Sequence, residues 1–190
     1  MNADIKKWLE KDGEQFLRKV GFKERQSVLD FGSGVGHYTI PAAKIVGSGS
    51  KVYAFDKDKN VLSELEKTAR QFSLENIELI NGNTKISLED NSVDAVLCYD
   101  VVHYMRNRTL MYDEAHRVLK PEGFFSLYPK HHKDDYPLME LASINLGSVI
   151  KEVEKSGFVL KDKLSMWCLH DDYYNECVIL NFTPLENKGL

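Results

Sequence analysis

Three glycines and two aspartates are the residues of this chain whose types and spacing favour binding of a nucleotide. Gly32, Gly34 and Gly36 alternate directly after a short apolar run that contains Asp30, and Asp56 ends a second apolar run 20 residues after the last glycine. A glycine-rich loop between a strand and a helix lets the main chain approach a ligand closely, and an acid at the next strand end can accept ribose hydroxyls. We therefore predict that a nucleoside-containing cofactor lies against this loop.

The spacing of the glycines argues against a dinucleotide. The dinucleotide fingerprint G-x-G-x-x-G would place its third glycine at residue 37, which is His37 in this chain. Asp30 also argues against it, because a carboxylate at the end of a buried strand needs a cation or a donor, and a pyrophosphate is itself an anion. We expect a ligand with a ribose at one end and an ammonium at the other. S-adenosylmethionine has both, and an NAD-dependent oxidoreductase is the less favoured alternative.

Two hydrophobic periods alternate from residue 27 onward. Short apolar runs indicate strands, and apolar residues at helical spacing indicate helices between them. The predicted strands are 27–31, 51–55, 77–80, 93–98, 124–128, 158–164 and 177–182. This alternation predicts an α/β fold: a single-domain Rossmann-like structure with a mostly parallel seven-stranded sheet, helices on both faces and an antiparallel C-terminal strand.

Several boundaries follow from turn and breaker residues. The segment Met1–Val20 has the pattern of one or two amphipathic helices, which we expect Gly13 to interrupt, with Asp12 as an N-cap. This segment either closes over the ligand as a lid or shields one edge of the sheet. A later helix that includes Leu119 is expected to end at Pro121-Glu122-Gly123.

One domain is expected over residues 1–190. Within it, the sequence predicts an N-terminal helical segment over 1–25, a cofactor-binding core over 26–128, and acceptor-side and C-terminal strands over 129–190.

Several blocks together resemble the class I S-adenosylmethionine-dependent methyltransferases, and specifically the compact group that includes the quinone-biosynthesis methyltransferases. The blocks cover most of residues 27–128 with matching spacing. They are VLDFGSGVGHYTIPAA at 28–43, AFDKD around Asp56, NGNT at 81–84, DNSVDAVLCYDVVHYM at 90–105 and EAHRVLKPEGFF at 114–125. The resemblance implies this methyltransferase fold and activity, with S-adenosylmethionine as the cofactor.

The resemblance also implies roles for individual residues. The backbone of residues 32–36 would lie against the methionine half of the cofactor, with Asp30 toward its ammonium, and Asp56 would hold the ribose hydroxyls. Asn83 stands where the family often has an aspartate at the adenine amino group; an amide can still accept from that group, and the alternative is a simple turn residue. Tyr99, at the end of the fourth strand, would border the sulfonium together with Asp100.

The full set of cofactor-binding residues expected on this basis includes further positions. The set is Asp30, Gly32, Ser33, Gly34, Gly36, Tyr38, Asp56, Lys57, Asn83, Thr84 and Tyr99. Ser33 departs mildly from the small or cysteine residue that is frequent between the first two glycines. Tyr38 either covers the methionine end or packs.

Methyl transfer from a sulfonium needs alignment and exclusion of water more than it needs a catalytic set. A general base is required only if the acceptor must lose a proton. His103 is the single candidate for such a base, and a packing role for it is favoured. Adjacent His131 and His132, with Lys130, suit an acceptor pocket or solvent better than a metal, so no metal site is predicted. Residues 136–139 are a further possible wall of the acceptor pocket.

Composition limits the possible partners. The 190 residues carry a net charge of −4, with lysines and arginines scattered among acids, which argues against a nucleic-acid footprint. The N-terminal stretch has no signal-peptide core, no apolar run is long enough to span a membrane, and the three cysteines show no metal or disulfide spacing. We expect a cytoplasmic protein with a small-molecule acceptor. A non-catalytic S-adenosylmethionine binder is an alternative, and no motif indicates an oligomeric state.

Overall fold

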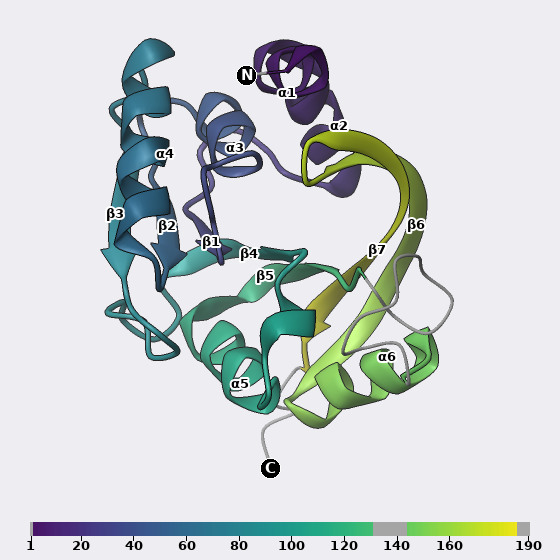
Figure 1. Ribbon diagram of the computed structural model, residues 1–190. Helices are drawn as coiled ribbons and strands as arrows, with labels where there is room; N and C mark the ends of the chain where they lie inside the picture. Colours follow the sequence, from purple (N-terminus) through teal and green to yellow (C-terminus); the bar gives the residue numbers. More distant parts are fainter. Residues whose placement is uncertain (1, 131–143, 186–190) are drawn as a thin grey trace.

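The computed structural model describes residues 2–130 and 144–185. One sheet of seven strands lies between helices (Figure 1). The strands are β1 Val28–Phe31, β2 Val52–Asp56, β3 Ile77–Asn81, β4 Val93–Tyr99, β5 Leu119–Tyr128, β6 Phe158–His170 and β7 Tyr173–Pro184. The helices are α1 Ala3–Lys7, α2 Gly13–Val20, α3 Thr39–Val46, α4 Lys59–Gln71, α5 Thr109–Val118 and α6 Leu146–Lys155, with a π-helical turn over Trp8–Asp12 and a 3₁₀ turn over Val102–Tyr104.

The order of the strands places a ligand-binding edge next to β1. The order is β3-β2-β1-β4-β5-β7-β6; the pairs from β3 to β5 are parallel, and β7 is antiparallel to both β5 and β6. The predicted fold is therefore confirmed. Strand order reverses at β1, which has β2 on one side and β4 on the other, and ligands of such sheets bind outside the carboxyl ends of the strands at this point.

Apolar residues at helical spacing bury the helices against both faces of the sheet. On α4, Leu62, Leu65 and Ala69 pack into one core cluster with α2 and α3. On α5, Met111 and Ala115 pack with α6 residues into a second cluster on the other face. Figure 1 shows these two layers, with α1 to α4 on one side of the sheet and α5 and α6 on the other.

The N-terminal segment is a continuous helical run, and the prediction that Gly13 interrupts it is wrong. Gly13 has helical dihedral angles, and Asp12 makes no capping hydrogen bond there. A Cβ on Gly13 would lie 2.5 Å from Pro41 Cγ on α3, so the glycine permits close helix packing rather than a break. Trp8, Phe16 and other apolar residues of this run are buried in the core, as expected for a segment that covers one face of the sheet.

Two boundaries near the second half of the chain also differ from the sequence prediction. α5 ends at Val118 and β5 begins at Leu119, so Pro121-Glu122-Gly123 lies within the start of a strand instead of ending the helix. The pairing of β4 with β5 is irregular there, which accommodates the proline. The last two strands pair antiparallel as predicted, but they extend to His170 and from Tyr173, well beyond the expected 158–164 and 177–182.

Candidate functional site

A cavity of about 470 Å³ opens at the carboxyl ends of β1, β2 and β4. Its walls are formed by the glycine loop after β1, the end of β2, the loop after β3 and the irregular segment after β4. Its lining comprises Phe31, Gly32, Gly34, Phe55, Asp56, Lys57, Asn83, Thr84, Asp100, Val101, Tyr104, Met105, Arg106, Asn107 and Leu110. Six of the residues expected to bind cofactor are therefore together in one cavity, namely Gly32, Gly34, Asp56, Lys57, Asn83 and Thr84.

The glycine loop approaches the cavity with its main chain. The amides of Gly32 and Ser33 donate to the carbonyl oxygen of Phe55 at 2.8 and 3.1 Å, which ties the loop to the end of β2. Gly34 has a φ of +52°, in the region that favours glycine, and a Cβ there would meet nothing within 4 Å. Open space therefore lies directly against the backbone at Gly34, where a ligand can approach.

Asp56 is half-buried at the end of β2, and its carboxylate organises the loops on either side. Its Oδ2 accepts from the Gly34 amide at 2.9 Å, and its Oδ1 accepts from the Asp58 amide at 2.9 Å. Each carboxylate oxygen can accept more than one hydrogen bond, so both remain able to receive hydroxyl donors. This is the chemistry that recognition of ribose requires.

Asp30 has a different environment, because it is buried at the end of β1. Its Oδ2 accepts from the Thr39 hydroxyl at 2.6 Å, and Thr39 begins α3. Burial raises the pKa of Asp30 to about 7, the hydrogen bond from Thr39 opposes that rise, and the charge of Asp56 adds to it. Sequence reasoning missed Thr39, although its place at the start of the helix after a glycine loop was a usable signal.

Five of the expected residues do not line the cavity, namely Asp30, Ser33, Gly36, Tyr38 and Tyr99. Tyr38 and Tyr99 belong to an aromatic cluster on the α2–α3 side of the sheet, where their ring centroids are 4.7 Å apart. The Tyr38 hydroxyl donates to the carbonyl of Leu169 on β6 at 2.6 Å, and the Tyr99 and Ser126 hydroxyls are 2.6 Å apart. These tyrosines are therefore part of the core on that side of the sheet and not of the cavity lining.

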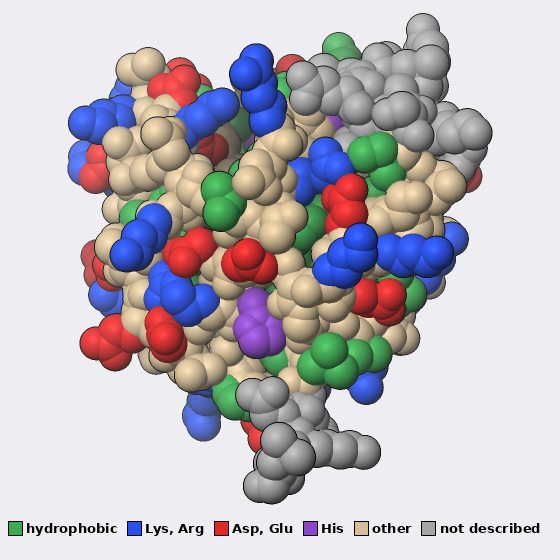
Figure 2. Space-filling view, turned by 90° about the horizontal axis from the view of Figure 1, so that it is seen from below, with side chains coloured by type: hydrophobic (Ala, Val, Ile, Leu, Met, Phe, Trp, Pro, Cys, Tyr) green, Lys and Arg blue, Asp and Glu red, His purple; other side chains and the backbone are tan. Residues whose placement is uncertain are grey.

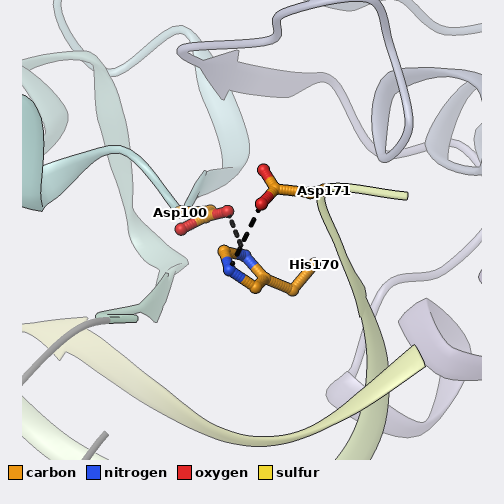
Figure 3. Close-up of side chains that lie close together, drawn as sticks. All are labelled: Asp100, His170 and Asp171. Carbon is orange, nitrogen blue, oxygen red and sulfur yellow. Dashed lines mark hydrogen bonds and ion pairs between the residues drawn. The ribbon is translucent and has the colours of Figure 1, made fainter. Parts of the chain in front are cut away.

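Two histidines from different elements lie near the carboxylate of Asp100, in the segment after β4. Asp100 lines the cavity, and its Oδ2 lies 2.5 Å from Nδ1 of His170, at the end of β6 (Figure 3). His103 is buried on the 3₁₀ turn, with Nδ1 3.6 Å from Asp100 Oδ1. Asp171 adds a third side chain, with Oδ2 3.6 Å from His170 Nε2. Ligand atoms of Asp100, His170 and Asp171 lie within 4.8 Å of one another, but the 2.5 Å contact is that of a hydrogen bond rather than of two ligands on one ion.

Some residues of the site could not be recognised in advance. Val101, Met105 and Arg106 line the cavity from an irregular segment that has no hydrophobic period. His170 lies 70 residues from Asp100, in a strand that was expected to end at 164. His131, His132 and residues 136–139, considered above for the acceptor pocket, lie outside the described residues.

The residues present fit S-adenosylmethionine. The cavity volume falls within the range of roughly 300–1,000 Å³ typical of cofactor sites. Ser33 Oγ is buried in the glycine loop and has no hydrogen-bond partner among the described residues, so a polar ligand atom would satisfy it. Gly34 leaves open space at the backbone, and Asp56 offers carboxylate oxygens at the same wall.

Comparison with known proteins identifies the same class. A family profile for the methyltransferase domain matches residues 22–183. The chain is 32% identical over 108 residues to a demethylmenaquinone methyltransferase of Geobacillus stearothermophilus, an alignment that covers 56% of this chain and 46% of that protein. It is 34% identical over 82 residues to a probable cobalt-precorrin-6B C(15)-methyltransferase of Sulfurisphaera tokodaii, covering 42% and 43% of the two chains. The matched region thus spans about half the length of these relatives.

A solved structure agrees with this over nearly the whole chain. A SAM-dependent methyltransferase from Aquifex aeolicus has a similar fold, with a TM-score of 0.78 and 24% identity, covering 94% of this chain and 93% of that one. The chain therefore belongs to the methyltransferase domain family, as its motifs predicted, and has the fold of the class I S-adenosylmethionine-dependent methyltransferases, a class of enzyme whose cofactor is S-adenosylmethionine.

Proposed function

We propose that this chain transfers the methyl group of S-adenosylmethionine to a small-molecule acceptor by in-line displacement. The observation that carries the proposal is the cavity at the carboxyl edge of the sheet, which joins the glycine loop, Asp56 and the Asn83–Thr84 loop. When bound, the cofactor supplies an electrophilic methyl group on a sulfonium. The residues of the chain then have to bind, align and exclude water.

The proposed binding roles follow the surroundings of each residue. Asp56 accepts the ribose hydroxyls, while Lys57, Asn83 and Thr84 form the wall for the adenine. The main chain of residues 32–36 lies along the methionine half, where Ser33 Oγ gains a partner. Asp30 acts on the ammonium at that end, directly or through water, and becomes ionised when the cation is bound.

A small acceptor is the second part of the proposal. The two relatives above are named for demethylmenaquinone and for cobalt-precorrin-6B, which are small molecules. Basic and acidic side chains are interspersed on the face of the molecule in Figure 2, a pattern unlike the clustered basic surface that nucleic acids require. None of the described helices is long and apolar enough to cross a membrane.

The location and the domain organisation are proposed with the function. All three cysteines are among the described residues, and no disulfide bond joins them, as in a reducing cytoplasm. We place the activity there, in one domain over residues 1–190.

Calorimetry tests cofactor binding. S-adenosylmethionine should bind saturably and NADH should not. Asp56→Ala should weaken binding by about 1–3 kcal/mol, because the ribose donors lose their acceptor. Asp58→Asn is the matched control: Asp58 is an exposed N-cap of α4 that does not line the cavity, and asparagine caps equally well. If wild type and Asp56→Ala bind S-adenosylmethionine with equal affinity, the ribose does not bind at Asp56. Tight binding of NADH without binding of S-adenosylmethionine would favour an oxidoreductase.

Methyl transfer itself is tested with labelled cofactor. The purified chain is incubated with methyl-labelled S-adenosylmethionine and a fractionated cell extract, and labelled small molecules are identified by mass spectrometry. Label should enter a low-molecular-weight fraction. Saturable cofactor binding with no transfer to any fraction would support the non-catalytic binder instead, and label in RNA or protein would contradict a small acceptor.

A further inference from the structure

The direction of β6 brings an imidazole next to Asp100, a residue of the cavity wall. β5 is parallel to β4, and β7 is antiparallel to both β5 and β6, so β6 runs in the same direction as β4. Its last residue, His170, therefore reaches the same edge of the sheet as Asp100. Figure 3 shows His170 beside Asp100 and Asp171, with a dashed line from its ring to each carboxylate.

Asp100 is held firmly in place for this contact. Its backbone has a φ of +60°, in the left-handed region that non-glycine residues rarely adopt, and its amide donates to the carbonyl of Tyr128 at 3.1 Å. Such conformations persist where the surrounding structure imposes them, and they gather at functional sites. Because Asp100 also lines the cavity, His170 lies one side chain away from the cavity wall.

The hydrogen bond defines which ring nitrogen can take part in chemistry. With Nδ1 of His170 2.5 Å from Asp100 Oδ2, a neutral imidazole donates through Nδ1–H to the carboxylate. Nε2, 3.6 Å from Asp171 Oδ2, is then the unprotonated ring nitrogen, and the two carboxylates stabilise the imidazolium that forms when it takes up a proton. His103 does not have this relation to Asp100, since its Nδ1 is 3.6 Å from Oδ1, beyond hydrogen-bond distance.

The surroundings of His170 raise its pKa above the usual value. Burial lowers the pKa of His170, but the hydrogen bond and the charge of Asp100 raise it by more, so the net shift is upward from 6.5. Asp171 in the adjoining turn also raises the pKa, and Lys130 after β5 lowers it. The Tyr128 ring on β5 faces the imidazole edge-on at 6.5 Å.

We infer that His170 is the general base of this site, oriented by Asp100, and that the acceptor is protic: a hydroxyl, a thiol or an acidic carbon. The inference rests on the proposed methyl transfer. As the bond between the acceptor atom and the methyl carbon forms, the carbon–sulfur bond breaks and its electron pair stays on sulfur. The acceptor's proton moves to Nε2 of His170, which leaves an imidazolium paired with the Asp100 carboxylate.

Four variants separate base catalysis from a structural contact. His170→Asn keeps an amide donor near the position of Nδ1 but cannot take up a proton, whereas His170→Ala removes both. Asp100→Asn removes the charge that fixes the tautomer. His116→Gln is the control, because His116 is a partly buried histidine on α5 that packs against Phe158 and does not line the cavity.

The first measurement uses the chain alone. Long-range ¹H–¹⁵N NMR over pH 5–9 should find His170 protonated on Nδ1 when neutral, with its titration above 6.5 and shifted to lower pH in Asp100→Asn. His116→Gln should leave the His170 resonances unchanged. A neutral His170 that carries its proton on Nε2, or a titration that Asp100→Asn leaves unmoved, overturns the inference without reference to any acceptor.

The second measurement is the rate of methyl labelling of the extract fraction described above, as a function of pH. In wild type, the rate should fall as pH drops through the His170 titration. His170→Asn should lose that limb and at least about a hundredfold in rate, with cofactor affinity unchanged. If His170→Asn keeps the wild-type rate and profile, the contact is structural and the inference fails while the proposed function stands. If wild type binds cofactor and labels nothing, both fail together.

Discussion

Asp30 and Asp56 end neighbouring parallel strands, yet the fold gives their carboxylates different properties. Asp56 is half-buried and accepts from two backbone amides. Asp30 is nearly fully buried and accepts from the Thr39 hydroxyl. Burial penalises the charged form, so Asp30 takes up a proton near neutral pH.

Because of Asp30, the free energy of unfolding of the chain should therefore decrease as pH rises. Its pKa in the folded state, about 7, lies above its usual 3.8, so its contribution is fully present below about pH 4 and is lost as pH rises toward 7. The loss is at most about 1.4 kcal/mol for each pH unit in that window. Asp30→Asn should remove it, so the free energy of unfolding of the variant relative to wild type should rise between pH 4 and 7. Urea unfolding at both pH values measures this difference, and parallel pH profiles would contradict the raised pKa.

At the scale of elements, Gly13 shows how a glycine in a helix can serve packing. A glycine to alanine change inside a helix is normally stabilising by up to about 1 kcal/mol. At Gly13 the added Cβ would lie 2.5 Å from Pro41 Cγ and 3.0 Å from Trp8 Nε1. Neither neighbour can move freely, because Pro41 is within α3 and Trp8 donates to the carbonyl of His37 at 2.8 Å.

Gly13→Ala should therefore destabilise the chain, by about 1–3 kcal/mol. Gly147→Ala is the matched control in the first turn of α6, where the nearest atom to an added Cβ is Asn145 Oδ1 at 3.4 Å. The control should be neutral or slightly stabilising. Chemical denaturation of both variants measures the difference, and equal effects would show that the contact with Pro41 relaxes.

Arg117 on α5 anchors the loop between β3 and β4. It donates to the carbonyls of Ile86 and Leu88 at 2.9 and 2.8 Å and to Asp90 Oδ1 at 2.7 Å. It also binds both carboxylate oxygens of Glu114, whose Oε2 accepts from the Ile86 amide at 2.9 Å. One guanidinium thus fixes the loop that begins with the Asn83–Thr84 wall of the cavity.

Arg117→Ala should cost about 1–3 kcal/mol of stability and weaken cofactor binding several-fold, because the loop with Asn83 and Thr84 loosens. Arg70→Ala is the control: Arg70 forms an exposed pair with Glu66 on α4, and its loss should change stability by less than about 0.5 kcal/mol. Denaturation and calorimetry measure both quantities. A variant that loses stability but keeps wild-type affinity would show that the wall of the cavity does not depend on this anchor.

The sequence predicted elements with strong local signals and failed where distant packing decides. The parallel strands, the glycine loop after β1 and the position of Asp56 at the end of β2 were predicted correctly, because hydrophobic period and turn chemistry act over a few residues. The break at Gly13 was wrong because the contact that requires a glycine, Pro41, lies on another helix. The Asp100–His170 pair was missed because 70 residues and a strand reversal separate its members.

For the whole molecule, the fold and the family were predictable because the motif blocks are spread over the parallel core, and both predictions are confirmed. The roles of single cofactor residues stay predictions. A cofactor that binds the folded state but not the unfolded state raises the free energy of unfolding. Because one sheet carries both core clusters, this stabilisation applies to the whole described fold.

S-adenosylmethionine at about a hundred times its dissociation constant should therefore add about 2.7 kcal/mol of stability and raise the melting temperature by about 5–10 °C. Differential scanning calorimetry measures the shift. NADH at the same concentration and the Asp56→Ala variant with S-adenosylmethionine are the controls, and each should show a smaller shift or none. An equal shift with NADH would contradict the specificity of the cavity.

Because β7 is antiparallel to β5 and β6, the turn before it lies near the cavity but comes from a part of the chain that does not line it. All of the lining residues lie between Phe31 and Leu110, whereas the turn at Asp171 and Asp172 belongs to a hairpin that joins the sheet through β5. Substitutions and insertions in that turn can reshape the neighbourhood of His170 while leaving the glycine loop and Asp56 untouched. If His170 serves the acceptor as inferred above, exchange of this turn alone would change the choice of acceptor and leave the cofactor-binding residues unchanged.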